Sequence, residues 1–332
     1  MSRLDSVRRS DRLSDSDSWP PVHTYSIVAV DHEAGEIGVA VQSHWFSVGS
    51  TVPWAEAGVG AVATQSFVNL SFGPRGLELL RKGLGPQQVV EELLASDPSG
   101  QMRQLAVIDR HGTAAAHTGR RCVPEAGHVL GGSFSVQANL MASADVWPAM
   151  AGSFQSSSGP LAERLVEALG AAQACGGDLR GTQSAAIVVV RVEPTGMIWK
   201  DRLIDLRVED HRDPLGELGR LLRVFRAYEH MNRGDEALEA EDGPEALREY
   251  GKARRLYPDS QEIRFWSAVS LVNAGKLEQA LPLFAELFAP HPNWATLLER
   301  IYGLGLLRTD KHSYERIIAP FKRTSERRDE KR

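Results

Sequence analysis

Amide and hydroxyl residues recur at the ends of otherwise apolar stretches of this chain. Such groups are costly to bury unless each one finds a hydrogen-bond partner. The pattern therefore predicts either a set of satisfied turns and caps or a shared polar pocket that binds amide or carboxylate groups. In the second interpretation, the candidates for substrate binding are Gln42, Ser43, Gln65, Asn139 and Gln183, with Ser66, Gln137 and Ser184 beside them.

Thr24 opens the first apolar stretch, which ends at Asp31 and resumes over residues 36–43 as the second arm of a predicted antiparallel hairpin. As a free N-terminus, Thr24 would combine a hydroxyl nucleophile with its own α-amino base, whose pKa of about 8 lies close to working pH. That combination is the chemistry of an amide-bond hydrolase. In this chain Thr24 follows His23, and an amide nitrogen cannot accept the proton. The chemistry therefore requires cleavage of the His23–Thr24 bond.

Residues 1–23 differ in composition from the rest of the chain, because they are rich in Ser, Asp and Arg and lack the apolar region of a secretory signal. We expect a disordered extension, since such a segment buries too little apolar surface to fold. A pro-segment that ends at His23 is the alternative. A misassigned start codon would also produce this extension.

The densest polar and glycine-rich segment is residues 176–184, between a predicted helix and an apolar strand. Glycine lets a backbone approach a ligand closely. In the functional interpretation, Asp178 is catalytic because it orients the nucleophile or an ammonium group, and Arg180 binds a substrate carboxylate. In the structural interpretation, the two side chains pair only to hold the loop.

Several other functions are disfavoured. A net charge of −5 argues against nucleic acid or an anionic membrane as a partner, and no apolar run approaches the roughly 20 residues of a membrane span. Two cysteines give neither a disulfide framework nor a multi-cysteine metal site, so we expect a reduced, cytoplasmic setting. Residues 58–63 match a dinucleotide fingerprint but continue as a strand, and His111, His117 and His128 fall in or near predicted turns. We therefore expect no metal and no cofactor.

The order of elements predicts an α+β fold. Pairs of helices, rather than single crossover helices, interrupt the strands, which favours antiparallel sheets with helices packed outside them. A four-layer α-β-β-α sandwich over residues 24–212 would use both pairs. Strand signals occupy residues 25–31, 36–43, 47–52, 58–66, 103–110, 113–118, 133–139, 183–191 and 203–208, and the helix pairs occupy 73–82 with 86–96 and 144–154 with 160–174.

Residues 213–308 are predicted to be helical and contain an internal repeat. The positions Ala246, Tyr250, Ala253 and Pro258 recur 34 residues later as Ala280, Phe284, Leu287 and Pro292. This period and these residue types are typical of a tetratricopeptide unit. We expect an all-α tetratricopeptide-like domain that binds a protein partner and that leans on the first domain or on the partner, because short arrays need support. Residues 309–332 are predicted to form a charged tail.

A specific set of short segments lies along this part of the chain, at residues 38–41, 48–54, 58–65, 73–77, 127–128, 137–139, 177–185 and 205–208. With these segments, residues 24 to about 212 resemble the DUF1028 family, a bacterial group of unknown function. The resemblance implies the fold of an N-terminal nucleophile hydrolase, which is an α-β-β-α sandwich. Family members commonly begin Met-Thr, so Thr24 takes the place of the residue exposed by removal of Met, and the 23 preceding residues depart from the pattern.

Three hypotheses are consistent with these residues. In the first, the protein hydrolyses a small amide or peptide-like substrate with Thr24 as nucleophile, Asp178 as orienting residue and Arg180 as anchor, while Gln42, Ser43 or Asn139 line the oxyanion pocket. In the second, it is a non-catalytic scaffold whose repeats dock a protein partner. In the third, it is a ligand-binding protein that uses the same pocket. An oligomer is compatible with all three.

Overall fold

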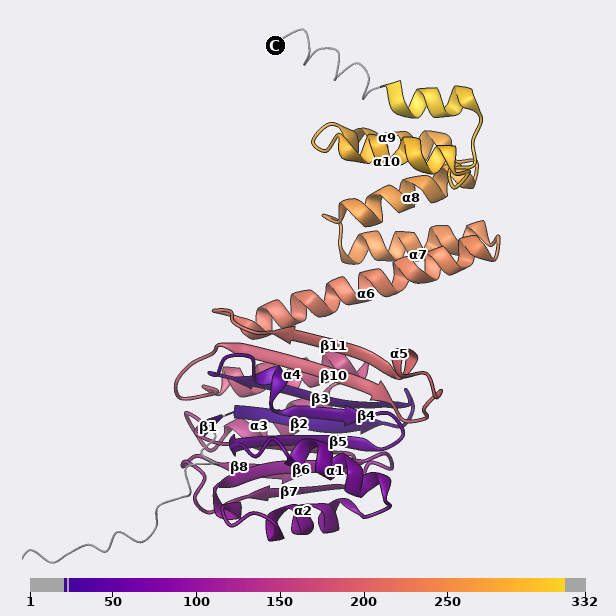
Figure 1. Cartoon of the computed structure of the whole chain (residues 1–332). Coiled ribbons are helices and arrows are strands. Elements are labelled where there is room, and N and C mark those ends of the chain that lie inside the picture. The colour runs from indigo at the N-terminus through magenta and orange to yellow at the C-terminus, as the bar shows by residue number, and fades with distance from the viewer. Residues whose placement is uncertain (1–20, 23, 320–332) are drawn as a thin grey trace, which may run out of the picture. The chain divides into compact units, whose positions relative to one another are not determined.

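The computed structural model describes residues 21, 22 and 24–319 (Figure 1). The chain divides into a first unit that ends at Gly219 and a second that begins at Arg220. The division falls within α6 (Pro214–Glu239), a few residues beyond the boundary expected from the sequence. Most of the expected extension, residues 1–20 and 23, and the final charged residues 320–332 lie outside the described part of the chain.

One sheet of the first unit places the predicted hairpin at its centre. Strand β2 (Thr24–Asp31) pairs antiparallel with β3 (Glu36–Ser43), so that Thr24 lies opposite Ser43 at one end of the sheet. The complete strand order is β11 (Arg202–Val208), β10 (Ser184–Arg191), β3, β2, β9 (Phe134–Ala138) and β8 (Gly127–Leu130).

The other sheet is built on β5 (Gly60–Phe67), which pairs with β6 (Arg103–Asp109), and β6 pairs with β7 (Ala114–Thr118). The free side of β5 is shared by β4 (Pro53–Glu56) and by the two-residue strand β1 (Pro21–Val22). Val22 pairs with Ser66 in this sheet, whereas Thr24 begins β2 in the other sheet. The backbone therefore passes from one sheet to the other between residues 22 and 24.

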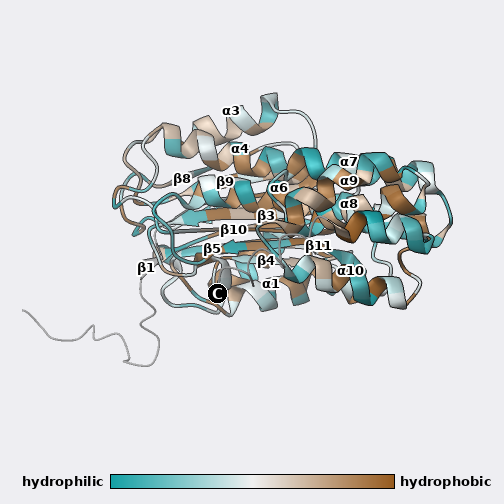
Figure 2. Cartoon of the chain, turned by 90° about the horizontal axis from the view of Figure 1, so that it is seen from above, coloured by the Kyte–Doolittle hydropathy of each residue, from teal (hydrophilic) through white to brown (hydrophobic). Residues whose placement is uncertain are grey.

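Two helix pairs cover the outer faces of the sheets, with α3 and α4 on one side and α1 on the other (Figure 2). Residues Phe72 and Leu93 of the first pair pack on Leu105 and Val107 of β6. The other pair approaches β3 so closely that a Cβ atom at Gly38 would lie 2.5 Å from the Leu165 side chain. The predicted α-β-β-α sandwich is confirmed. Its helices are α1 (Phe72–Arg81), α2 (Pro86–Ala95), α3 (Val146–Ser156) and α4 (Leu161–Ala174).

The apolar core between the two sheets shows which strand positions face inward. Val28 of β2, Val39 and Val41 of β3 and Ala63 of β5 all belong to it. Since successive strand side chains point to opposite faces, the even positions of β2 and the odd positions of β3 face the other sheet. This alternation decides which polar residues can meet near Thr24.

The prediction of a strand over residues 47–52 is wrong. Val48–Ser50 forms a short 3-10 helix, and the strand is β4 instead. The backbone N–H of Val48 donates to Ser184 Oγ at 3.0 Å, and a Cβ atom at Gly49 would lie 2.6 Å from that of Ala186. These contacts with β10 are tertiary, so the local apolar pattern does not reveal them. The short strand β8 and the short helix α5 (Ile198–Asp201) also escape the sequence pattern.

The second unit continues through helices that begin after capping residues. The Asp242 side chain accepts a hydrogen bond from the Glu245 N–H at 3.0 Å, and Ser260 Oγ accepts one from the Ile263 N–H at 3.2 Å. Such caps satisfy backbone donors that have no partner within the helix. The helices are α7 (Gly243–Leu256), α8 (Gln261–Asn273), α9 (Leu277–Phe288) and α10 (Asn293–Gly303).

The repeated apolar positions of α7 and α9 form part of the interior of this helical unit. Tyr250 and its equivalent Phe284 are each 1% exposed, and the small residues Ala246 and Ala280 are fully buried where paired helices approach. Residues 311–319 are also helical, and Ile317 with Ile318 joins the cluster around Phe284. The charged tail expected from residue 309 is therefore helical and packed over this range. Within the described residues, no helix is both long and apolar enough to cross a bilayer.

Candidate functional site

Thr24 is fully buried at the start of a central strand. Its cross-strand neighbour is Ser43, which is in turn the neighbour of Ser184 on β10. Ser26, two residues further along β2, donates a 2.6 Å hydrogen bond to Gln65 of the other sheet. Because Thr24 has the same strand parity as Ser26, its side chain also faces the space between the sheets. The register therefore brings the hydroxyl side chains of Thr24, Ser43 and Ser184 together on this inner face.

The backbone carbonyl oxygen of Thr24 accepts hydrogen bonds from three N–H donors. The Asn139 backbone N–H and the Gln65 Nε2 group each donate at 3.1 Å, and the Asn139 Nδ2 group donates at 3.4 Å. One donor residue comes from β5 of the opposite sheet, and the other directly follows β9. Both sheets thus hold the first peptide group of β2 in place.

The same amides continue into a longer buried network. Gln65 Nε2 and Asn139 Nδ2 donate to Gln104 Oε1 at 2.7 and 2.8 Å. Gln104 Nε2 donates to Thr118 Oγ1 at 2.9 Å, and that oxygen lies 2.8 Å from His128 Nδ1. A hydrogen-bonded path therefore runs from Thr24 to His128.

A second branch of the network lies along β9. Gln137 Nε2 donates to Ser26 Oγ at 2.5 Å, and Ser135 Oγ donates to Gln137 Oε1 at 3.0 Å. Gln65, Gln104 and Gln137 are all fully buried. Satisfied amides in such a site stabilise one arrangement of the core, because any broken bond would leave a buried group unpaired.

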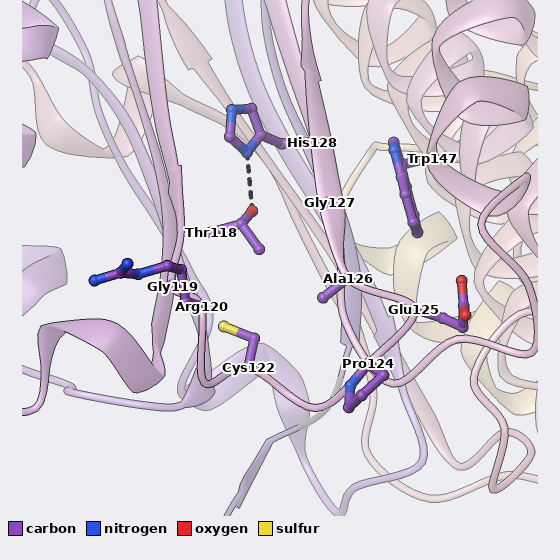
Figure 3. Close-up of a pocket in the computed structure, with 10 residues that line it drawn as sticks. All are labelled: Thr118, Gly119, Arg120, Cys122, Pro124, Glu125, Ala126, Gly127, His128 and Trp147. Atoms are coloured by element: carbon purple, nitrogen blue, oxygen red, sulfur yellow. Dashed lines mark hydrogen bonds between the residues drawn. The ribbon is translucent and has the colours of Figure 1, made fainter.

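The path from Thr24 ends at a cavity of about 500 Å³ (Figure 3). It lies at the same end of the sandwich as Thr24, because Gly127 on its wall pairs with Ala138, the residue before Asn139. The side chains on its wall include Thr118, Arg120, Cys122, Glu125, His128 and Trp147.

Both titratable groups with a resolved shift in this cavity favour their neutral forms. Burial lowers the pKa of the His128 imidazole, and the neighbouring His117 lowers it further. Burial also raises the pKa of the Cys122 thiol, although the neighbouring Ser66 and Gly119 oppose that effect. The Cys122 thiol donates to the Arg103 carbonyl oxygen at 3.4 Å. Because nucleophilic cysteines require a thiolate, Cys122 is not a strong candidate nucleophile.

Three non-glycine residues at this end of the sandwich have left-handed backbone conformations. Their φ angles are 69° at Ser66, 54° at Glu125 and 58° at Leu140. Ser66 pairs with β1, Glu125 lines the cavity and Leu140 follows Asn139. Such conformations cost about 1–3 kcal/mol each and cluster at functional sites.

Asp178 and Arg180 form a buried pair on the neighbouring loop. The Asp178 side chain is fully buried, and Arg180 donates to it from Nε at 3.0 Å and from Nη2 at 2.7 Å. The His44 backbone N–H also donates to the carboxylate, at 3.2 Å. This geometry holds the loop against the end of β3, directly after Ser43.

The remaining predicted site residues lie elsewhere. Gln42 has the opposite strand parity to Val39 and Val41, so its side chain faces the helix layer of α3 and α4, away from the inner face occupied by Thr24. Gln183 is half-buried, and its Nε2 donates to Asp210 at 3.2 Å. The structure thus gathers Thr24, Ser43, Gln65 and Asn139 but does not place Gln42 with them.

Sequence reasoning missed three residues of this site, namely Gln104, Thr118 and His128. Gln104 carried a usable signal, since it is a polar residue at an inward position of the strand that contains Leu105 and Val107. His128 has no local pattern, because its strand has only four residues, but residues 127–128 are one of the segments that carry the family resemblance. Among the described residues, no group of three or more His, Cys, Asp or Glu side chains is placed to hold a metal ion.

Comparisons with known proteins agree with the two-part organisation. The model of a family of unknown function, DUF1028, matches residues 24–218, and a tetratricopeptide repeat model matches residues 237–301. A crystal structure of a DUF1028 protein from Silicibacter pomeroyi is similar, with a TM-score of 0.55 and 31% sequence identity over 60% of this chain and 88% of that chain. No curated protein matches. The family match begins at Thr24.

Proposed function

The chain belongs to the DUF1028 family, and on that premise we propose that its first unit is an amide-bond hydrolase of the N-terminal nucleophile type. Thr24 is the nucleophile, and its α-amino group is the base once the His23–Thr24 bond has been cleaved. The observation that carries the proposal is the position of Thr24. It begins a central strand, faces the space between two sheets, and has its carbonyl held by donors from both.

The reaction uses only these groups and water. The α-amine accepts the hydroxyl proton as Thr24 Oγ1 attacks the substrate carbonyl, and the leaving amine then takes that proton. Water hydrolyses the resulting ester and regenerates the hydroxyl. Ser43 and Asn139 are the polar residues beside Thr24 that would stabilise the developing oxyanion. Asp178 and Arg180 are positioning residues in this proposal, because they hold the backbone that comes after Ser43.

The experiment compares chains that begin at Thr24 with the full-length chain. Intact mass of protein from its native host gives the natural N-terminus, and a removable fusion generates the Thr24 start in vitro. We expect hydrolysis of a panel of short peptides and aminoacyl anilides only by the chain that begins at Thr24. Thr24→Ala should lower the rate by a factor on the order of 10³ or more.

Thr113→Ala is the matched control, since Thr113 is exposed and its side chain lies outside the site. Equal hydrolysis by the Thr24→Ala variant would refute the role of Thr24. So would the absence of any hydrolysis by a folded chain that begins at Thr24.

A second candidate function is protein binding by the repeats. It is favoured by the tetratricopeptide match and by a cavity of about 520 Å³ in the second unit, lined by Leu247, Arg248 and Lys276 among others. A partner cross-linked to the native chain should be lost in Leu247→Asp and retained in Leu304→Asp, since Leu304 is 75% exposed and lies outside that cavity. Equal retention by both variants would argue against binding at this cavity.

A further inference from the structure

The cavity beside His128 carries an inference about the substrate. We propose that it binds a short peptide with a free carboxylate at one end and a free ammonium group at the other. This rests on the proposed function for its link to Thr24, but binding is measured separately from hydrolysis. The buried network ends at hydrogen-bonding groups on the cavity wall.

The network offers His128 a partner for one ring nitrogen. Thr118 Oγ1 accepts a hydrogen bond from Gln104 Nε2 and lies 2.8 Å from His128 Nδ1. Burial lowers the pKa of the ring, which favours its neutral form. In the arrangement that we propose, the Thr118 hydroxyl donates to Nδ1, and the hydrogen of the neutral imidazole is on Nε2.

Trp147 supplies a second N–H group to the cavity wall. Within the described chain, neither the Trp147 indole nitrogen nor His128 Nε2 has a protein acceptor. Both side chains are half-buried on the cavity wall, so these two N–H donors favour a ligand that carries carbonyl or carboxylate oxygens. A peptide bond is one such group.

Charges of opposite sign flank these donors. Arg120 and Glu125 lie on opposite sides of the cavity, with Cys122 and Ala126 between them (Figure 3). Arg120 is exposed and uses Nε for a 3.2 Å hydrogen bond to Gln101, which leaves its terminal N–H groups for a carboxylate at the rim of the cavity. Glu125 provides the complementary anion for an ammonium group.

The backbone holds Glu125 in place despite its left-handed φ of 54°. Its carbonyl oxygen accepts a 3.1 Å hydrogen bond from the Met141 N–H, two residues after Asn139. The Glu125 end of the cavity is therefore tied to the segment that donates to the Thr24 carbonyl. A peptide whose ammonium group meets Glu125 would lie along the wall that leads toward Thr24.

The size of the cavity and the Trp147 ring on its wall also fit a short peptide. The volume lies within the range of about 300–1,000 Å³ that is typical of small-molecule sites. The Trp147 ring packs against Gly127 so closely that a Cβ atom there would lie 2.5 Å from it, which requires glycine at this position and fixes the ring. The indole is half-buried and offers an apolar surface to a ligand side chain.

The test uses the full chain and its Thr24→Ala variant with L-alanyl-L-alanine as the probe. Nuclear magnetic resonance follows the Trp147 indole N–H, which the Trp147→Phe variant identifies. We expect saturable shifts in both chains. Arg120→Gln and Glu125→Gln should each weaken binding about tenfold, the equivalent of about 1.4 kcal/mol. Acetylation of the probe's amine or amidation of its carboxylate should have a similar effect.

Arg121→Gln is the matched control, because Arg121 is exposed and does not line the cavity. Equal weakening by Arg121→Gln and Arg120→Gln would overturn the proposal, as would equal binding of the free and blocked probes or no shift at saturating concentrations. Binding without hydrolysis by a chain that begins at Thr24 would support the pocket and refute the hydrolase. Hydrolysis that is unaffected by Arg120→Gln and Glu125→Gln would support the hydrolase and refute the role of this pocket.

Discussion

The Nε2 group of Gln65 donates a 3.1 Å hydrogen bond to the backbone carbonyl oxygen of Thr24, across the gap between the two sheets. The same amide group donates to Gln104, and its oxygen accepts from Ser26. A single side chain thus connects the first residue of β2 to the opposite sheet and to the path that leads to the His128 cavity. The position of Thr24 depends on this amide as well as on its own strand pairing.

Replacing Gln65 with Leu should destabilise the first unit by about 2–4 kcal/mol, because buried partners then lose their hydrogen bonds at about 1–3 kcal/mol each. Ser26 Oγ and Gln104 Oε1 are the atoms affected most directly. Urea denaturation measures the free energy of unfolding. A change below about 0.5 kcal/mol, the usual limit for a surface substitution, would contradict this account of the network.

Gln42→Leu should have the opposite outcome and serves as the matched substitution. Gln42 is also fully buried, but neither of its amide atoms has a hydrogen-bond partner in the described chain. An apolar side chain of similar size removes an uncompensated polar group, so the same urea experiment should show an unchanged or increased stability. A loss comparable to that of Gln65→Leu would show that Gln42 has a partner in solution.

The contrast between Gln42 and Gln65 also shows how far the sequence predicts the site. Both residues precede a serine at the end of a predicted strand, and the sequence pattern treats them alike. Strand alternation separates them, since Val39 and Val41 face the inter-sheet core and Gln42 therefore cannot. Both helix pairs and the long strands were predictable from local patterns, and the parity of each polar residue on those strands was available from the same patterns.

The contacts that complete the site were not predictable in this way. Gln104, Thr118 and His128 are brought together by the pairing of β6 with β7 and of β8 with β9. The first of these pairings is a hairpin that the turn at His111 and Gly112 predicts, but no local pattern specifies that β8 joins β9 or that the two sheets place these residues together. The same limitation explains the 3-10 helix at Val48–Ser50, whose conformation depends on contacts with β10.

Asp97→Asn should remove an acid-sensitive contribution to stability. Burial raises the pKa of Asp97, but hydrogen bonds from Arg103 and Asn69 outweigh it, so the pKa in the folded state is lowered. The resulting stability is present above the unfolded pKa of about 3.9 and is lost as the pH falls through the folded value. The native chain should therefore lose more stability than Asp97→Asn between pH 5 and pH 3.

The size of the neutral-pH effect provides a second check on Asp97. Its pair with Arg103 is nearly buried, with side-chain exposures of 6% and 8% at 2.8 Å. Removing one partner of such a pair costs about 3–5 kcal/mol, because the other charge remains buried and uncompensated. Thermal or urea unfolding at pH 7 measures this. Equal stability of Asp97→Asn and the native chain would contradict the pair's role.

His128 should make the first unit less stable as the pH falls below about 6.5, the unfolded pKa of histidine. Burial lowers the pKa of the folded imidazole, so the unfolded chain binds the proton first and gains stability from it. The loss continues until the pH reaches the lowered folded value. His128→Asn retains an acceptor for Thr118 but does not titrate, so urea midpoints at pH 7.5 and pH 5.5 should differ less in this variant than in the native chain.

The effect of His117 on the pKa of His128 can be tested separately. His117 is the neighbour that lowers the pKa of the His128 ring, and Arg120 and Glu125 line the same cavity. Since His117 lowers the pKa of His128, His117→Asn should raise it, and nuclear magnetic resonance titration of the His128 ring measures the change. His111→Asn is the control, because His111 is exposed in the turn before Gly112. An equal effect of both variants would contradict the role of His117, and a native pKa above about 6.5 would contradict the effect of burial on His128.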